Sequence, residues 1–255
     1  MEISNFKSGY ENSAEFYDLF AQNDDIPFYL EQAKKQNSPI LDLAAGTGRV
    51  TIPLAEAGFK IFSLESSEAM LNQTKKKITN LSREVRDRIT LIHGDMTDFQ
   101  LEEKFKLIII PNSFGHCLTT EKQLSCLKCI STHLSNDGLF ILDLFPGGTL
   151  REKGTFKDNP VKINHNKEVV RTGIYYTDFI KQILELELKF EIYQNAKVIK
   201  EITEHSKVAV IFNREINLLL KNAGFEIREQ FCNWTKQTYE PNLNCSRRIL
   251  VLCLK

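Results

Sequence analysis

The chain has 255 residues, of which 42% are hydrophobic, so it is long enough and apolar enough to bury a substantial core in one or two domains. Its 33 basic and 33 acidic side chains give a formal net charge of zero, so the overall charge does not favour electrostatic capture of nucleic acid or of an anionic membrane. No apolar run approaches the roughly 18 residues that span a bilayer. The first residues lack the basic and apolar pattern of a signal peptide, so we expect a cytoplasmic protein.

Residues 1–38 are expected to form two helical pieces ahead of the core. Aromatic residues cluster in the first piece, and Ile26-Pro27 opens the second. Tyr10 and Tyr17 have two interpretations: they contact a ligand, or they are aromatic anchors that hold a leading helix on the core.

The stretch Ile40–Gly48 predicts a strand, a tight turn and the start of a helix. Its apolar beginning suits a parallel strand buried on both faces. Gly46 and Gly48 let the backbone turn sharply and approach a ligand closely. A helix over 49–57 would direct its free N–H groups at that ligand. The glycine spacing differs from the G-x-G-x-x-G dinucleotide fingerprint, and no Gly-Lys-Ser/Thr follows as in a P-loop.

A second short strand, 60–65, ends on an acid. In open α/β sheets the ligand lies beyond the carboxyl ends of the strands, where Glu65 could accept hydrogen bonds from both hydroxyls of a ribose. The alternative is a solvated acid at the start of the next helix, because Ser66 and Ser67 are good N-caps and Glu68 favours a first turn.

After a helix at 68–81, a third strand, 89–93, leads into Gly94-Asp95-Met96. A carboxylate at Asp95 can accept from an exocyclic amine, and the thioether of Met96 packs well on an aromatic ring. Alternatively, Asp95 caps a turn.

A fourth strand, 105–110, ends in the loop Pro111-Asn112-Ser113-Phe114-Gly115-His116, which leaves the middle of the sheet. A helix at 120–134, a turn at Asn136-Asp-Gly138 and a fifth strand at 139–145 are expected next.

An insertion at roughly 150–212 then interrupts the alternation of strand and helix. Within 184–192 every even residue is apolar and every odd one is charged, which predicts an antiparallel strand with one wet face. Neighbouring strands are expected at 169–176 and 198–212, with Gln194-Asn195 as a hairpin turn. The core then resumes with a helix at 214–222 and strands at 225–231 and 247–254.

The six cysteines do not indicate a metal site. Cys126 and Cys129 have the C-x-x-C spacing but lie in a helical pattern, without a second pair of ligands, so buried small apolar side chains are the better interpretation. The others are Cys117, Cys232, Cys245 and Cys253. In a reduced cytosolic state none of these four needs a partner.

The turn Asp42-Leu-Ala44-Ala-Gly46-Thr-Gly48 resembles motif I of the class I S-adenosylmethionine-dependent methyltransferases, with Ala44 in place of the first glycine. Glu65, the Gly-Asp-Met segment and the Asn-Ser-Phe-Gly-His loop extend the resemblance, which covers about 40–145 and 213–255. It implies a Rossmann-like α/β fold: a seven-stranded, mostly parallel sheet with helices on both faces, plus an inserted antiparallel β lid.

The domain boundaries follow from this resemblance. Residues 1–149 and 213–255 are expected to form the core that binds S-adenosylmethionine, with 1–38 as a helical N-terminal cap that folds over the cofactor. Residues 150–212 are expected to form the lid. A similar sheet in sugar-amine and glycine N-methyltransferases covers the substrate and sometimes mediates dimerisation, so a homodimer through the lid is one assembly that the resemblance implies.

The resemblance also assigns site residues, with S-adenosylmethionine as cofactor, S-adenosylhomocysteine as product and no metal. The expected cofactor-binding residues are Tyr17, Asp42, Ala44, Gly46, Gly48, Arg49, Glu65, Ser66, Met70, Asp95, Met96, Pro111 and Asn112. Ser113 is also expected near the methionine part of the cofactor. The expected substrate-binding residues are Tyr10, His116, Arg171, Tyr175 and Tyr176. His116 is the expected catalytic residue, to orient or deprotonate the acceptor; a core or surface histidine is the alternative.

The expected reaction is methyl transfer to a small-molecule acceptor, with nitrogen slightly favoured over oxygen. Pro111 precedes Asn112, whereas enzymes that methylate base amines of nucleic acids carry Asn/Asp-Pro-Pro-Tyr/Phe, so a nucleic-acid substrate is disfavoured. Two alternatives stay open: a non-catalytic nucleoside-binding module, and a methyltransferase acting on RNA or protein. A nicotinamide-dependent oxidoreductase is disfavoured by the glycine spacing.

Overall fold

The computed structural model describes residues 10–145, 150–240, 245 and 248–254. The central sheet contains β1 (Ile40–Leu43), β2 (Ile61–Glu65), β3 (Ile89–His93), β4 (Phe105–Ile110), β5 (Leu134–Leu144), β11 (Phe225–Phe231) and β12 (Arg248–Leu254). The second sheet contains β6 (Lys153–Lys157), β7 (Val161–Asn164), β8 (Lys167–Asp178), β9 (Ile183–Gln194) and β10 (Lys197–Ala209). The helices are η1 (Ala14–Phe16), α1 (Tyr17–Phe20), α2 (Ile26–Gln36), α3 (Thr51–Glu56), α4 (Glu68–Thr79), α5 (Arg83–Arg86), η2 (Phe114–His116), α6 (Thr120–His133) and α7 (Asn213–Asn222).

The central sheet has seven strands in the order β11-β12-β5-β4-β1-β2-β3. The five strands from β5 to β3 pair in parallel, whereas β12 is antiparallel to both β5 and β11. The predicted seven-stranded, mostly parallel sheet is therefore confirmed. Because parallel strands end at the same edge, the loops after β1, β2, β3 and β4 gather at one edge of this sheet.

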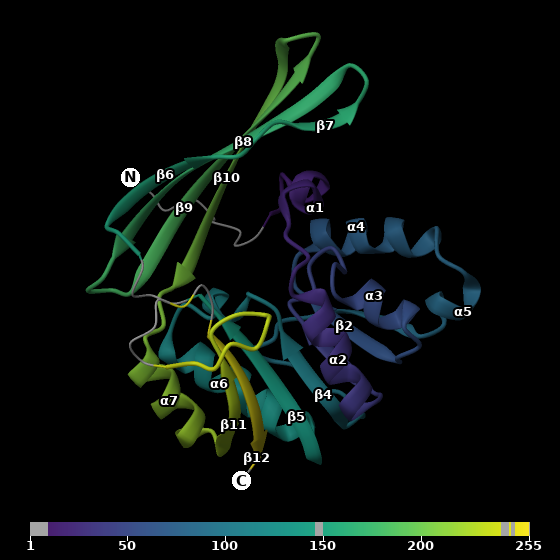
Figure 1. The fold of residues 1–255 in the computed structure, drawn as a ribbon, viewed down its shortest axis with the longest axis vertical. Helices are drawn as coiled ribbons and strands as arrows, with labels where there is room; N and C mark the ends of the chain where they lie inside the picture. Colours follow the sequence, from purple (N-terminus) through teal and green to yellow (C-terminus); the bar gives the residue numbers. More distant parts are fainter. Residues whose placement is uncertain (1–9, 146–149, 241–244, 246–247, 255) are drawn as a thin grey trace.

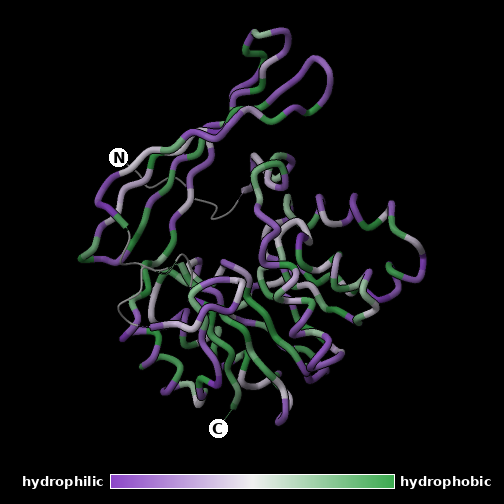
Figure 2. Tube along the Cα trace, in the orientation of Figure 1, coloured by the Kyte–Doolittle hydropathy of each residue, from purple (hydrophilic) through white to green (hydrophobic). Residues whose placement is uncertain are grey.

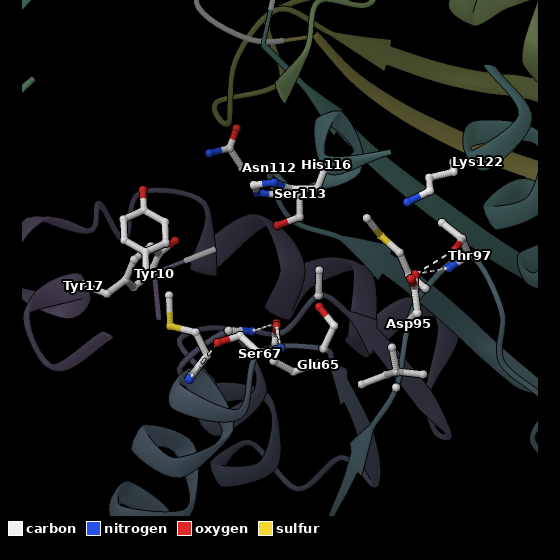
Figure 3. A pocket seen from close by; sticks show the side chains of 17 residues that line it. Tyr10, Tyr17, Glu65, Ser67, Asp95, Thr97, Asn112, Ser113, His116 and Lys122 are labelled. Atoms are coloured by element: carbon white, nitrogen blue, oxygen red, sulfur yellow. Dashed lines mark hydrogen bonds between the residues drawn. The ribbon is translucent and has the colours of Figure 1, made fainter. Parts of the chain in front are cut away.

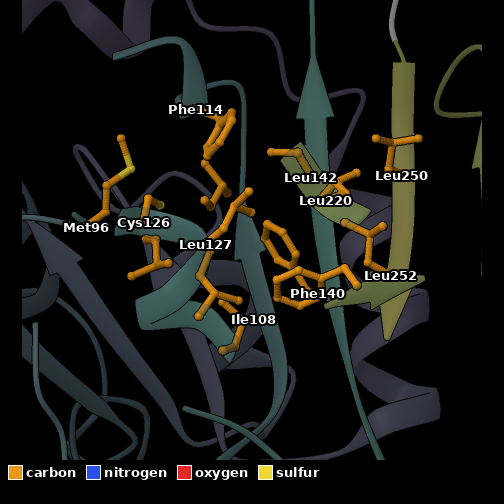
Figure 4. Packing of buried hydrophobic residues seen from close by; sticks show 14 of the residues in the cluster. Met96, Ile108, Phe114, Cys126, Leu127, Phe140, Leu142, Leu220, Leu250 and Leu252 are labelled. Atoms are coloured by element: carbon orange, nitrogen blue, oxygen red, sulfur yellow. The ribbon is translucent and has the colours of Figure 1, made fainter. Parts of the chain in front are cut away.

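Helices cover both faces of the central sheet (Figure 1). On one face, α6 and α7 pack Leu127 and Leu220 against strand residues such as Ile108 and Phe140 (Figure 4). On the other face, α2 and α3 pack against a second apolar cluster that includes Ile40. Burial on both faces explains why these strands read as continuous apolar runs in Figure 2.

The second sheet extends away from the central one (Figure 1) and is antiparallel, in the order β10-β9-β8-β6, with β7 paired to β8. The predicted alternation in β9 is confirmed, since Leu188 and Phe190 are buried and Glu185 and Glu187 are exposed. The hairpin turn between β9 and β10 falls at Asn195 and Ala196, which both have positive φ. The buried face packs on the N-terminal segment, which we define as Tyr10–Asp25.

Several element boundaries differ from the prediction. The helix after the glycine turn begins at Thr51 instead of Arg49, because residues 46–50 are still turning. The turn expected at 136–138 lies inside β5, since this strand already pairs with β4 at Leu134. Strands β6 and β7 were not predicted from the sequence, because each is short and mostly exposed. Within the described ranges, no helix is long and apolar enough to cross a membrane.

The expectation that the scattered cysteines need no partner is wrong for Cys232 and Cys245, which form a disulfide. Cys232 directly follows β11 and Cys245 lies shortly before β12, so the antiparallel pairing of these strands brings their Cα atoms to 4.9 Å. Cys126 and Cys129 lie in α6 as predicted, and both are free thiols.

Candidate functional site

A cavity lies at the edge of the central sheet where β1, β2, β3 and β4 end (Figure 3). Loops after these four strands supply most of its lining, and the N-terminal segment, α4 and α6 supply the rest. The lining residues are Tyr10, Tyr17, Ala44, Gly46, Leu64, Glu65, Ser66, Ser67, Met70, Gly94, Asp95, Met96, Thr97, Asn112, Ser113, His116 and Lys122.

The glycine turn after β1 has a left-handed backbone at three alternating positions, with φ of 54° at Ala44, 60° at Gly46 and 74° at Gly48. A Cβ atom added to Gly46 would meet nothing within 4 Å, so its backbone is open to the cavity. A Cβ atom on Gly48 would lie 2.8 Å from Cγ2 of Thr74. Gly48 is therefore needed for packing against α4.

Glu65, at the end of β2, is held rigidly at the floor of the cavity. Its Oε2 accepts a hydrogen bond from the Gly46 amide at 2.8 Å, and its Oε1 accepts from the Ser67 amide at 2.7 Å. A carboxylate has about four acceptor positions, so each oxygen can accept one further hydrogen bond. The side chain is thus preorganised to receive two hydroxyl groups.

One end of the cavity combines an acid with a thioether. Asp95 Oδ1 accepts from both the amide and the hydroxyl of Thr97, each at 2.8 Å, and Met96 is buried beside it. The Lys122 side chain reaches this end from the first turn of α6 (Figure 3). This end offers a carboxylate for an amine and an apolar surface for a ring.

The opposite end is formed by Tyr10 and Tyr17 of the N-terminal segment (Figure 3). Their rings meet edge to face, with centroids 4.9 Å apart. Burial raises the pKa of Tyr17 and raises the pKa of Tyr10 to about 12. Both phenols therefore stay neutral at pH 7 and can donate and accept hydrogen bonds there.

The loop after β4 contributes Asn112, Ser113 and His116 between these two ends. Ser113 Oγ donates to the Pro111 carbonyl at 2.9 Å, which tightens the loop. Burial lowers the pKa of His116, so its imidazole is neutral at pH 7. A neutral imidazole can accept a proton from a ligand beside it.

Four predicted cofactor residues lie outside this cavity. Gly48 packs against Thr74, as described above, and the Pro111 carbonyl accepts from Ser113. Asp42 is fully buried and accepts from Thr51 Oγ1 at 2.7 Å, and burial raises its pKa to about 7. Arg49 pairs with Asp25 and donates to the Gln22 carbonyl at 2.9 Å, so it holds the N-terminal segment instead of a ligand.

Among the predicted substrate residues, Tyr10 and His116 line the cavity and the three residues of β8 do not. Arg171 Nε donates to Asp158 at 2.7 Å, and its guanidinium lies 4.6 Å from the centre of the Phe20 ring. Tyr175 lies over Gly154 of β6. Tyr176, on the other face of β8, is 50% exposed.

Leu64, Ser67, Gly94, Thr97 and Lys122 line the cavity but were not predicted as site residues. Ser67 is the N-cap of α4, a role that the sequence does indicate. Lys122 lies three residues after Thr119, which caps α6 through its hydroxyl. The sequence offered one signal for Lys122: it lies in the first turn of a helix whose N-cap, Thr119, closely follows the β4 loop.

Residues 40–138 match a family model described as a methyltransferase domain. The dTDP-3-amino-3,4,6-trideoxy-alpha-D-glucopyranose N,N-dimethyltransferase of Streptomyces venezuelae is 24% identical, over 84% of this chain and 90% of that protein. The CcbJ methyltransferase from Streptomyces caelestis has a similar fold, with a TM-score of 0.82 at 19% identity over 98% and 99% of the two chains. The SAM-bound amino pentose methyltransferase CalS10 from Micromonospora echinaspora superposes over the full length of both chains, with a TM-score of 0.72 at 17% identity.

Proposed function

We propose that this chain, which belongs to the class I S-adenosylmethionine-dependent methyltransferases, methylates a nitrogen atom of a small-molecule acceptor. The observation that carries the proposal is the polarity of the cavity. One end offers an acid beside a thioether, the other offers neutral phenols, and a neutral imidazole lies between them. A relative that covers most of this chain is named for an amino sugar.

The residues of the cavity fit S-adenosylmethionine. We assign Glu65 to the ribose hydroxyls, Asp95 to the adenine amine and the thioethers of Met70 and Met96 to the apolar contacts of the cofactor. The open side of Gly46 gives the amino-acid part access to the backbone of the turn. When bound, the cofactor supplies an electrophilic methyl group on a positively charged sulfur.

The acceptor then lies between the β4 loop and the N-terminal segment. An amine reaches the enzyme largely as an ammonium ion, and it must lose a proton before its lone pair can attack. His116, kept neutral by burial, is the group that we assign to accept this proton. Tyr10 is assigned to orient the acceptor through its neutral hydroxyl group, whereas Tyr17, whose neighbour Asp18 bonds the glycine turn, is assigned to the cofactor.

We further propose that the second sheet acts as a lid and as the surface of a homodimer. Its outer face carries Ile174 and Tyr176, which are 36% and 50% exposed. Burying such side chains against a second copy would remove apolar area from water. Light scattering at several protein concentrations measures the assembly, and replacement of both residues by lysine is expected to give a monomer.

The cofactor assignment is tested by calorimetric titration with S-adenosylmethionine, S-adenosylhomocysteine and NAD. We expect both sulfur nucleosides to bind and NAD not to bind. Because hydrogen bonds to a charged group contribute roughly 1.5–3 kcal/mol each, Glu65→Ala should weaken both nucleosides at least about tenfold. Glu68→Ala, at an exposed position in the first turn of α4, is the control that should bind normally. Binding of NAD alone would remove the proposal.

The acceptor assignment is tested by pairing each amine with its hydroxyl analogue. The panel contains free amino sugars, nucleotide-linked amino sugars, small primary and secondary amines, a short peptide and an RNA. Mass spectrometry detects S-adenosylhomocysteine and the methylated product. We expect turnover of an amine and none of its hydroxyl analogue. Methylation of hydroxyl analogues, peptide or RNA alone would contradict the assignment.

A further inference from the structure

The second sheet contains a buried carboxylate, Glu204, that the proposed chemistry does not use. It lies in β10 opposite Leu188 of β9, on the face that packs against the N-terminal segment, and only 4% of its surface is exposed. A carboxylate is costly to bury unless it is hydrogen-bonded. The groups that donate hydrogen bonds to Glu204 therefore indicate the role of its side chain.

The backbone and side-chain donors to Glu204, from Asn12 and Ser13, lie just after Tyr10. Its Oε2 accepts from the Asn12 amide at 2.8 Å and from the Ser13 hydroxyl at 3.2 Å. The Ser13 amide in turn donates to the Tyr10 carbonyl at 3.3 Å, and the Ser13 side chain is fully buried. Glu204 thus holds the turn that carries the Tyr10 side chain into the cavity.

Aromatic contacts hold the next residues on the same sheet. Phe16 stacks on Phe190 with ring centroids 5.9 Å apart, and Phe20 meets the edge of Phe190 at 6.0 Å. Figure 1 shows α1 between the second sheet and the central sheet. The beginning of the N-terminal segment is therefore fixed from the side of the second sheet.

A different anchor holds the segment on the side of the glycine turn. Asp18 accepts from the Thr47 hydroxyl at 2.6 Å and from Lys77 Nζ of α4 at 2.7 Å. Thr47 lies between the two glycines of the turn, next to Gly46 in the cavity wall. Tyr17, directly before Asp18, is thereby tied to the cofactor side.

We propose that Glu204 is a positioning residue that fixes Tyr10 for the acceptor, without a share in cofactor binding. The role of Tyr10 toward an acceptor rests on the proposed function. The separation follows from the two anchors: Glu204 links the second sheet to Tyr10, whereas Asp18 links the glycine turn to Tyr17. Loss of the Glu204 carboxylate leaves the Asn12 amide and the Ser13 hydroxyl without this acceptor, so the turn loosens.

The test compares four variants. Glu204→Leu removes the acceptor oxygens and keeps an apolar side chain on the inner face, and Glu204→Gln restores one acceptor oxygen. Asp18→Asn weakens the other anchor. Glu187→Gln, at an exposed position on the opposite face of the same sheet, is the matched control. Ser13→Ala, which removes one donor, replaces Glu204→Leu if that variant does not fold.

Three quantities are measured on each variant: the affinity for S-adenosylhomocysteine by calorimetry, amide hydrogen exchange over 10–17, and kcat and KM with the methylated amine. For Glu204→Leu we expect about tenfold faster exchange and a KM for the amine about tenfold higher, with nucleoside affinity within about twofold of the wild type. Glu204→Gln should recover most of the KM, and Asp18→Asn should weaken S-adenosylhomocysteine by about tenfold. Glu187→Gln should match the wild type.

The proposal is overturned if Glu204→Leu weakens S-adenosylhomocysteine as much as Asp18→Asn does, because the segment would then move as one body. It is also overturned if exchange over 10–17 does not change. Both outcomes are independent of the acceptor. Failure to methylate any amine would contradict the proposed function. Hydrogen exchange over 10–17 and the affinity for S-adenosylhomocysteine would still show whether Glu204 fixes the Tyr10 turn without affecting nucleoside binding.

Discussion

The buried carboxyl group of Asp42 makes a quantitative prediction about stability and pH. Burial outweighs the Thr51 hydrogen bond and the charge of Arg49 and raises the pKa of Asp42 from 3.8 to about 7 in the folded protein. Between these values the folded state binds a proton that the unfolded state releases, so the free energy of unfolding falls as pH rises and levels off above about pH 7. At about 1.4 kcal/mol per pH unit, and with the slope smaller near both pKa values, this group removes about 3 kcal/mol of stability between pH 4 and pH 7.

Asp42→Asn is expected to remove this dependence, because the amide does not titrate and its oxygen can still accept from Thr51. Urea unfolding followed by circular dichroism at pH 5, 6, 7 and 8, without reductant, gives the free energy of unfolding of each protein. From pH 5 to pH 7 the wild type should lose about 2 kcal/mol relative to the variant. Other carboxyl groups titrate in both proteins and cancel in the difference.

Asp24→Asn, at an exposed position of the N-terminal segment, is the control that should keep the wild-type slope. Parallel curves for the wild type and Asp42→Asn would refute the reasoning. Asp42 would then be ionised in the folded protein, and its charge would have to be balanced within the polar cluster under the glycine turn.

Three further predictions concern backbone and covalent features. Gly46→Ala and Gly58→Ala should each lower stability by about 1 kcal/mol, since both positions have positive φ and open space, but only Gly46→Ala should weaken S-adenosylhomocysteine in calorimetry, because only Gly46 lines the cavity. Ala44→Gly should raise the free energy of unfolding by about 0.5 kcal/mol, and with it the urea midpoint, because it removes a left-handed alanine at φ 54°. A lower urea midpoint would contradict this. Replacing Cys232 and Cys245 with serine should lower the free energy of unfolding by about 3 kcal/mol, since the bridge closes a loop with a sequence separation of 13, and unchanged unfolding curves would show that the link adds nothing.

The strands of the central sheet were the most predictable part of the fold. The predicted bounds of β3 and β4 agree with the structure. β4 lies inside the sheet and is buried except at the half-buried Lys106, so the strand is mostly apolar. The residues that follow such strands were equally accessible to sequence reasoning. Glu65 and Asp95 line the cavity because parallel strands deliver their carboxyl ends to one edge.

Side-chain direction within a turn was not predictable, because tertiary partners decide it. Arg49 follows the glycine turn, where it was expected to bind the cofactor. Its guanidinium instead donates to the carboxylate of Asp25, 24 positions earlier in the chain. Gly48 looks equivalent to Gly46 in sequence, yet α4 covers it. Tyr175 and Tyr176 were predicted together, although adjacent residues of a strand must point to opposite faces. That error could have been avoided from the alternation alone.

The hydrogen bond between Asn12 and Glu204 also has a consequence for the order of folding. It joins residues 192 positions apart, whereas the links from Asp18 to Thr47 and from Arg49 to Asp25 span 29 and 24 positions. Closing a longer loop costs more chain entropy, and non-local pairings form late. During synthesis from the N-terminus, the nucleoside side of the cavity can assemble while the second sheet is still unmade. The side that receives Tyr10 must wait for β10, so a truncated chain would complete the glycine-turn side of the cavity before the side that we propose for the acceptor.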